Sequence, residues 1–144
     1  MKKLLSIITA CAFLTPLYAD EMMSMKEYLI LNADDNSDAV AVYTSKRCSA
    51  TFLVVAKIFG ENTPENKRVH DLMIAKGSDL MTTAATIEAD SNNRDVIQVM
   101  GEVSGQIKIM VDKLMKISDK SYANTGVYLT PHQEDLTICN SIFN

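Results

Sequence analysis

The spacing of apolar residues between positions 91 and 126 constrains the fold of this chain more than any other feature. Apolar side chains recur there at steps of four and three residues: Val96, Met100, Val103, Ile107, Met110, Leu114 and Ile117. This period places them on one side of an α-helix, along a single continuous seam. We predict that Asn92 or Asn93 caps the start of this helix, with Asp95 at the positive end of its dipole. Gly126 is expected to end it. A seam of this length can be covered by other helices of the chain or by a second copy.

A second long helix is expected from Thr63 to about Ala89. Thr63 suits the N-cap, and Pro64 suits the first helical position because no N–H is needed there. The residues that share one face are Val69, Leu72, Met73, Gly77, Leu80, Ala84 and Ile87. A glycine inside a helix costs about 1 kcal/mol relative to alanine, so Gly77 indicates that a neighbouring helix approaches closely there. The alternative is that the glycine is simply tolerated.

Residues 37–59 are expected to form a central helix. Their second half, "TFLVVAKIF", is rich in β-branched residues and could also form a buried strand. However, no glycine or proline interrupts the segment, and Gly60 stands where a helix C-cap belongs. The main apolar stripe contains Ala41, Cys48, Phe52, Val55 and Phe59, and other sides are apolar at Leu53, Val54 and Ile58. A helix that is apolar on several sides is expected to lie among the others.

Shorter helices are predicted at both ends. Residues 22–31, "MMSMKEYLIL", precede the central helix. In the tail, Thr130 is the expected N-cap, Pro131 the first helical residue and Gln133 the partner in a capping box. The apolar stripe of the tail helix contains Leu136, Cys139 and Phe143. The sequence therefore predicts an all-α, single-domain antiparallel bundle of three long helices with shorter N- and C-terminal helices.

Residues 1–19 have the layout of a bacterial-type secretory signal peptide. Two lysines follow the first methionine, an apolar run extends from Leu4 to Leu14, and cleavage is expected between Ala19 and Asp20. This apolar run is shorter than the roughly 20 residues that a membrane-spanning helix needs. We therefore expect an exported protein in the periplasm or outside the cell.

A lipoprotein cleavage site is the alternative. The segment Ile8–Cys11 resembles such a site, with Cys11 as the residue that would be acylated. The apolar segment before it would contain only about seven residues, which is at the short limit for a leader. Apolar sequence also continues past Cys11 to Leu14, so cleavage after Ala19 is the preferred prediction.

The charge of the expected mature chain excludes several partners. Cleavage removes two of the 14 basic residues and leaves 12 against 18 acidic ones, a net charge of −6. An acidic chain without a basic stripe does not attract nucleic acid or an anionic membrane surface. The remaining residues, 20–144, are enough for one domain with its own core.

Cys48 and Cys139 are predicted to form a disulfide bond. They are the two cysteines of the mature chain, and both lie on apolar stripes. An export compartment is oxidising, and two cysteines allow one intramolecular pairing. The bond would close a loop of about 90 residues, worth roughly 4 to 5 kcal/mol in the chain-entropy model. A nucleophilic or redox thiol is disfavoured, because the chain has no C-x-x-C motif.

Two possible metal sites are weak. Residues 34–38, "DDNSD", resemble the start of a calcium loop, but Ala39 and Ser45 replace the required glycine and glutamate. A polar turn in which Asn36 or Ser37 caps the next helix is the preferred interpretation. The methionines of "EMMSM", Met22, Met23 and Met25, are possible Cu(I) ligands, but no histidine accompanies them.

The two histidines do not form a recognisable catalytic group. His70 precedes Asp71, and neighbouring side chains on a helix point about 100° apart, so no relay is expected from their adjacency. His132 is expected to be a solvated residue in the first turn of the tail helix. No H-E-x-x-H, G-x-S-x-G or glycine-rich phosphate loop occurs in the sequence.

These observations predict a protein that binds rather than catalyses, with no catalytic residue, cofactor or bound metal. The preferred hypothesis is an exported interaction protein whose partner is another protein, such as an inhibitor, an immunity-type factor or an envelope accessory factor. The alternative is a carrier of a small ligand or Cu(I), which would use the methionine-rich start or a pocket in the core. The sequence identifies neither the partner nor the oligomeric state.

Overall fold

The computed structural model describes residues 22–128 and 132–143. Within them the chain forms five helices: α1 (Met25–Leu31), α2 (Asp38–Phe59), α3 (Pro64–Asn92), α4 (Val96–Thr125) and α5 (His132–Ile142). This confirms the predicted all-α bundle of three long helices with a shorter helix at each end. The predicted signal peptide, its cleavage site and Cys11 lie outside the described residues, as do Thr130 and Pro131 before α5.

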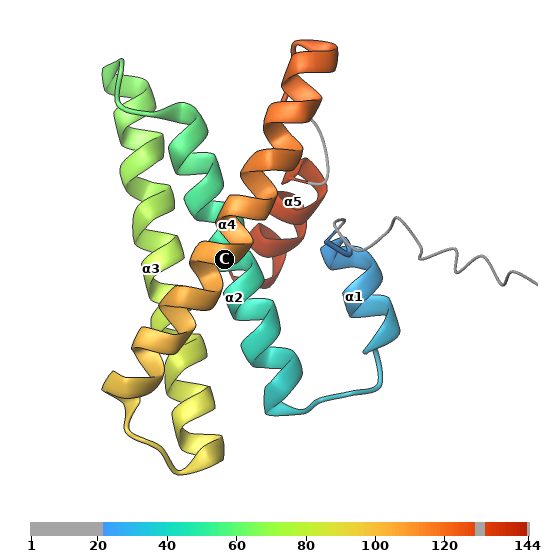
Figure 1. Cartoon of the computed structure of the whole chain (residues 1–144), viewed down its shortest axis with the longest axis vertical. Coiled ribbons are helices and arrows are strands. Elements are labelled where there is room, and N and C mark those ends of the chain that lie inside the picture. Colours follow the sequence, from blue (N-terminus) through green and yellow to red (C-terminus); the bar gives the residue numbers. More distant parts are fainter. Residues whose placement is uncertain (1–21, 129–131, 144) are drawn as a thin grey trace, which may run out of the picture.

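Helix α2 lies at the centre of the bundle, as predicted. It packs against α3, α4 and α5, while α1 packs against α5. Figure 1 shows α2 and α3 side by side in opposite directions, with α4 crossing both at an angle. Every residue from Thr44 to Phe52 is buried, so the middle of α2 has no solvent-exposed side. The stripe predicted for α2 was wrong at its two ends, since Ala41 and Phe59 are exposed.

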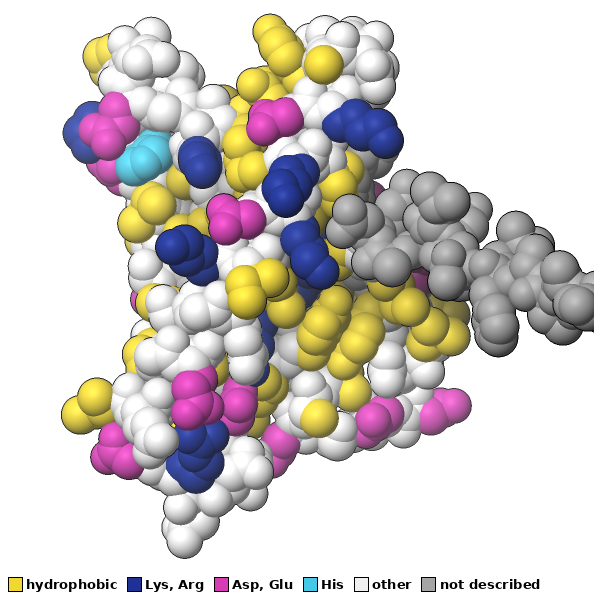
Figure 2. Space-filling view, viewed as in Figure 1, with side chains coloured by type: hydrophobic (Ala, Val, Ile, Leu, Met, Phe, Trp, Pro, Cys, Tyr) yellow, Lys and Arg dark blue, Asp and Glu magenta, His cyan; other side chains and the backbone are white. Residues whose placement is uncertain are grey.

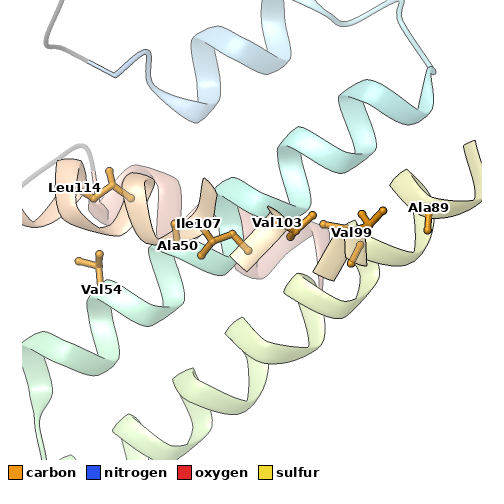
Figure 3. Close-up of a cluster of buried hydrophobic side chains, with 9 residues drawn as sticks. Ala50, Val54, Ala89, Val99, Val103, Ile107 and Leu114 are labelled. Carbon is orange, nitrogen blue, oxygen red and sulfur yellow. The ribbon is translucent and has the colours of Figure 1, made fainter. Parts of the chain in front are cut away.

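Two clusters of apolar side chains make up the core. The larger joins α2, α3 and α4 and contains Ala50, Val54, Ala84, Ala85, Ala89, Val99, Val103, Ile107 and Leu114. Figure 3 shows labelled members of this cluster on all three helices, with those of α4 spaced along its length. The smaller cluster joins α1, α2, α3 and α5 and contains Met25, Cys48, Phe52, Leu80 and Cys139. Helix α2 contributes to both clusters and therefore connects the two halves of the core.

The seam on α4 is confirmed in its middle but begins later than predicted. Val103, Ile107 and Leu114 are buried, whereas Val96 is 41% exposed and Val99 occupies the first core position instead. The predicted cap was also wrong. Asp95 is the N-cap, and its carboxylate accepts hydrogen bonds from the backbone N–H groups of the next turn. Helix α3 continues further than expected, which leaves only a short connection before α4.

Asn92 and Asn93, which were predicted to cap the start of α4, lie at the end of α3 instead. Asn92 is the last residue of α3, and Asn93 is its left-handed C-cap with φ of 51°. Asparagine tolerates this backbone conformation better than most residues. Three other boundary predictions are confirmed: Thr63 caps α3, Gly60 caps the end of α2 and Gly126 caps the end of α4.

Gly77 marks a close contact between α3 and α2, as predicted. A Cβ atom at this position would lie 2.9 Å from Leu53 Cγ and 3.3 Å from the backbone oxygen of Ser49. The hydroxyl of Ser49 donates a 2.7 Å hydrogen bond to the carbonyl oxygen of Gly77. The face predicted for α3 is wrong at Leu72, which is 52% exposed.

The predicted disulfide bond joins α2 to α5. The Cys48 and Cys139 sulfur atoms are bonded, and their Cα atoms lie 5.4 Å apart. Both side chains are fully buried. On α5, Leu136 and Phe143 are partly buried and pack against the same cluster, as the predicted stripe requires. The bond therefore fixes the C-terminal helix across the buried middle of α2.

Candidate binding site

A pocket of about 440 Å³ lies between three helices of the bundle. Its walls come from the first half of α2, the end of α3 and the middle of α4. Ten residues line it: Asp38, Ala39, Val42, Tyr43, Lys46, Glu88, Ser91, Asn92, Gln106 and Met110. Its volume falls within the range of small-molecule sites, roughly 300–1,000 Å³.

Lys46 is the charged group in the inner wall of the pocket. It belongs to the buried middle of α2, and its side chain is only 8% exposed. Its ammonium group donates hydrogen bonds to Glu88 on α3 and, over 2.6 Å, to the Gln106 side-chain oxygen on α4. A buried charge needs such partners, because an unpaired one would lose its hydration without compensation. Lys46 therefore ties the three walls together.

The opening of the pocket is polar. Asp38 is exposed in the first turn of α2, and its Oδ2 accepts a 2.5 Å hydrogen bond from the hydroxyl of Ser91 on α3. The Asn92 side chain donates a 2.8 Å hydrogen bond to the backbone oxygen of Glu88. Because α3 ends at Asn92, the partial negative charge of its C-terminus lies at this opening.

Apolar groups form the remaining wall. They come from α2 and α4 and include Ala39, Val42, Tyr43 and Met110. The ring of Tyr43 packs against that of Tyr28 on α1, with 4.0 Å between the ring centroids. Burial raises the pKa of Tyr28, and the nearby Tyr43 and Asp35 raise it further. The pocket thus combines an aromatic and aliphatic surface with charged groups.

The ion pair Arg94–Glu102 lies near this charged wall. Two hydrogen bonds of 2.9 Å and 2.5 Å connect the guanidinium of Arg94 to the carboxylate of Glu102. The hydrogen bond from Arg94 lowers the pKa of Glu102, and the positive charge of Lys46 lowers it a little more. The charges of Arg94 and Glu102 cancel, so this pair adds no net charge near the pocket. The charged side chains of the lining are Asp38, Glu88 and Lys46, which together carry a net charge of −1.

A second buried polar cluster lies beside the disulfide bond. Arg47 and Asp135 are both 0% exposed, and Asp135 Oδ2 accepts hydrogen bonds from Arg47 Nε at 2.9 Å and Nη2 at 2.5 Å. Its other oxygen accepts the backbone N–H of Met25 at 2.9 Å. Asp135 thereby links α5 to α2 and to the start of α1. The sequence analysis did not identify Lys46 or Arg47 as buried residues, because it considered only the apolar side chains of this helix.

The three methionines proposed as Cu(I) ligands lie in different surroundings. Met25 is buried in the smaller core cluster, Met22 packs against the larger one, and Met23 is 44% exposed. Among the described residues, no group of three or more His, Cys, Asp or Glu side chains is placed to hold a metal ion. The sequence around 34–38 forms the expected polar turn, in which Asp35 accepts a 2.8 Å hydrogen bond from the backbone of Ser37.

The side chains of His70 and Asp71 are in contact, although no relay was expected from their adjacency. His70 Nδ1 lies 3.2 Å from Asp71 Oδ1. Asp71 also accepts hydrogen bonds from Lys67, which lower its pKa together with the contact to His70. In the described chain, no hydroxyl or thiol is hydrogen-bonded to His70. The group is a surface cluster at the start of α3, and the side chain of His132 lies outside the described part.

The chain has no significant match among protein-family models, curated proteins or solved structures. Of the helices described, none combines the length and the apolar character that crossing a membrane would need. The pocket between α2, α3 and α4 is therefore the feature from which a function can be argued.

Proposed function

We propose that the protein is an exported, non-catalytic binding protein, and that the pocket between α2, α3 and α4 is its ligand site. The observation that supports this is Lys46, a nearly buried lysine whose partners Glu88 and Gln106 come from two other helices. The sequence analysis left two kinds of partner open, another protein or a small ligand. A pocket between the helices favours the small ligand.

The walls of the pocket support reversible binding. Lys46, Glu88 and Gln106 are held by one another, so their positions are fixed before a ligand arrives. Fixed polar groups reduce the entropy lost on binding, and apolar residues such as Val42 and Met110 supply surface that a ligand can bury. Neither a histidine nor a cysteine is among the residues that line this pocket.

A block at the pocket opening tests this proposal. Ala39 is exposed in the first turn of α2 and lines the pocket. Ala39→Phe should fill part of the opening while leaving the buried core unchanged. A library of small molecules screened by ligand-observed NMR should give hits with the wild-type mature protein that disappear with Ala39→Phe. Hits that bind both proteins equally would contradict the proposed site.

Export is a separate part of the proposal, and it is supported by the sequence of residues 1–19. Intact-mass measurement of protein recovered from the periplasm or medium should show a chain that begins at Asp20 and carries no lipid. A diacylated chain beginning at Cys11 would contradict it and would make the protein membrane-anchored.

A protein partner is the second candidate function. It is supported by Ile30 and Leu31 at the end of α1, which are 64% and 70% exposed. Figure 2 shows further hydrophobic side chains at the surface near α1 and α4. Cross-linking in periplasmic extract should capture a protein with the wild-type chain but not with Ile30→Lys/Leu31→Lys. Equal capture by both chains would exclude this surface.

A further inference from the structure

The charges around the pocket identify the kind of ligand that it suits. Asp38 and Glu88 are negative and Lys46 is positive, so the lining side chains carry a net charge of −1. The end of α3 adds the partial negative charge of a helix C-terminus, and its last turn contains no basic residue. The start of α2 faces the same pocket, but Asp38 in its first turn offsets the positive end of that dipole.

One carboxylate oxygen at the opening remains free to bind a ligand. Asp38 Oδ2 accepts the hydrogen bond from Ser91, whereas Oδ1 has no hydrogen-bond partner within residues 22–128 and 132–143. An ammonium group could donate to Oδ1 and to backbone carbonyl oxygens at the end of α3. Charge-assisted hydrogen bonds of this kind are stronger than those between neutral groups.

The apolar wall of the pocket suits an apolar portion of the ligand. Ala39, Val42, Tyr43 and Met110 lie on the α2 and α4 sides of the same pocket. An aliphatic or aromatic body of a ligand would bury these groups, and the ring of Tyr43 could also attract a cation. The pocket therefore suits a molecule with one positive end and one apolar end.

We infer that the ligand is a small organic ammonium ion with an apolar body, which binds with its ammonium group at Asp38 and its body against Val42, Tyr43 and Met110. This inference rests on the proposed function of the same pocket. An anionic ligand is disfavoured because it would meet Asp38 and would have to displace Glu88 from Lys46. The displaced Glu88 would then be a carboxylate without its partner in a largely buried position.

Three indole compounds of similar size test the inference. Tryptamine carries an ammonium group at pH 7, tryptophol a neutral hydroxyl group and indole-3-propionate a carboxylate. Because the chain contains no tryptophan, indole fluorescence anisotropy reports the compound alone. When the mature, disulfide-bonded protein is added, the fluorescence anisotropy of tryptamine should increase and saturate, and tryptamine should bind most tightly of the three. The affinity order should be tryptamine, then tryptophol, then indole-3-propionate.

Matched variants separate charge recognition from a general effect on the fold. Asp38→Asn should lower the affinity for tryptamine roughly fivefold, which is the size expected for one partly screened ion pair. The affinity for tryptophol should not change. Asp79→Asn removes the same charge from an exposed position on α3 outside the pocket and should change neither affinity. Tryptamine should also shift the NMR signals of the Gln106 side-chain amide, because Gln106 lines the pocket. This test uses the wild-type protein and needs no variant.

The outcomes distinguish this inference from the proposed function. If indole-3-propionate or tryptophol binds as tightly as tryptamine, and Ala39→Phe abolishes that binding, the pocket remains a ligand site and the cation preference is wrong. If tryptamine does not bind, or binds without shifting the Gln106 signals, the inference is overturned. Tryptamine binding that Asp38→Asn weakens and Ala39→Phe abolishes supports both.

Discussion

Arg47 and Asp135 lie 88 residues apart in the sequence and form an ion pair in which both side chains are fully buried. Arg47 is next to Cys48 on α2, and Asp135 is one turn before Cys139 on α5. The ion pair and the disulfide bond therefore join the same two helices at adjacent positions. Asp135 also accepts the backbone N–H of Met25, so α1 depends on the same carboxylate.

We predict that breaking this ion pair from one side strongly destabilises the fold. Asp135→Asn and Arg47→Met should each lower the free energy of unfolding by about 3 to 5 kcal/mol, because each leaves a buried group without its partner. The double variant Arg47→Met/Asp135→Asn should cost less than the sum of the two, since no buried charge remains. Urea denaturation followed by circular dichroism measures all three. Strictly additive effects would show that the two charges do not depend on each other.

The exposed pair Arg94–Glu102 provides the control. Its two hydrogen bonds resemble those of Arg47 and Asp135, but both side chains are partly solvated. Water can replace a lost partner there, so Glu102→Gln should change stability very little. A large loss in this control would mean that burial does not explain the effect at Asp135.

Removal of the disulfide bond should also destabilise the protein, by roughly 2 to 5 kcal/mol. The bond joins residues separated by 91 positions, so it restricts the unfolded chain considerably. Cys48→Ala and Cys139→Ala should have similar effects, and the double variant should be no worse than either. The helix α5 should loosen first, because 11 residues are too few for a stable isolated helix.

Two measurements test the disulfide prediction. Hydrogen exchange in the reduced protein should be faster in α5 than in α3 or α4, and non-reducing peptide mapping should recover the Cys48–Cys139 peptide. Free thiols in protein from the periplasm, or a dimer linked through these cysteines, would contradict the prediction and make Cys48 available for another role.

The long helices could be predicted from the sequence because their signals are local. Gly60, Thr63 and Gly126 mark boundaries through backbone preferences that do not depend on the rest of the chain. The apolar period also identifies the buried face in the middle of each helix. It does not show where the buried face begins or how wide it is, so Val96 and Leu72 were assigned to the core although they are exposed.

The candidate site could not be predicted from the sequence. Lys46 and Arg47 are usually surface residues, and their burial depends on partners 42 and 88 residues away. The one available signal was their position inside a helix that is apolar on several sides. Such a helix leaves little surface for a charged side chain, so its charges must find partners in the interior.

Replacement of the three early methionines tests the Cu(I) alternative. Met22→Leu/Met23→Leu/Met25→Leu should bind the ligand of the pocket as the wild type does. Met25 is the one fully buried member, and a swap to leucine of similar volume costs less than about 1.5 kcal/mol. Titration with Cu(I) should show no stoichiometric binding to either protein. A one-to-one Cu(I) signal that the triple variant loses would contradict this and support a metal carrier.

Gly77 provides the sharpest test of helix packing, because the chain contains two matched controls. Gly101 and Gly105 lie within α4, and a Cβ atom at either position would meet nothing within 4 Å. Gly101→Ala and Gly105→Ala should therefore each raise the free energy of unfolding by about 0.5 to 1 kcal/mol through helix propensity alone.

At Gly77 the same substitution gains this propensity but forces Leu53 and the Ser49 carbonyl away from α3. Overpacking in a core costs about 1 to 3 kcal/mol, which exceeds the gain. Gly77→Ala should therefore be about 2 kcal/mol less stable than Gly101→Ala in urea denaturation. The hydrogen bond from Ser49 to the Gly77 carbonyl should lengthen as the helices separate. If Gly77→Ala were as stabilising as the two controls, α2 and α3 would not be in close contact at this position.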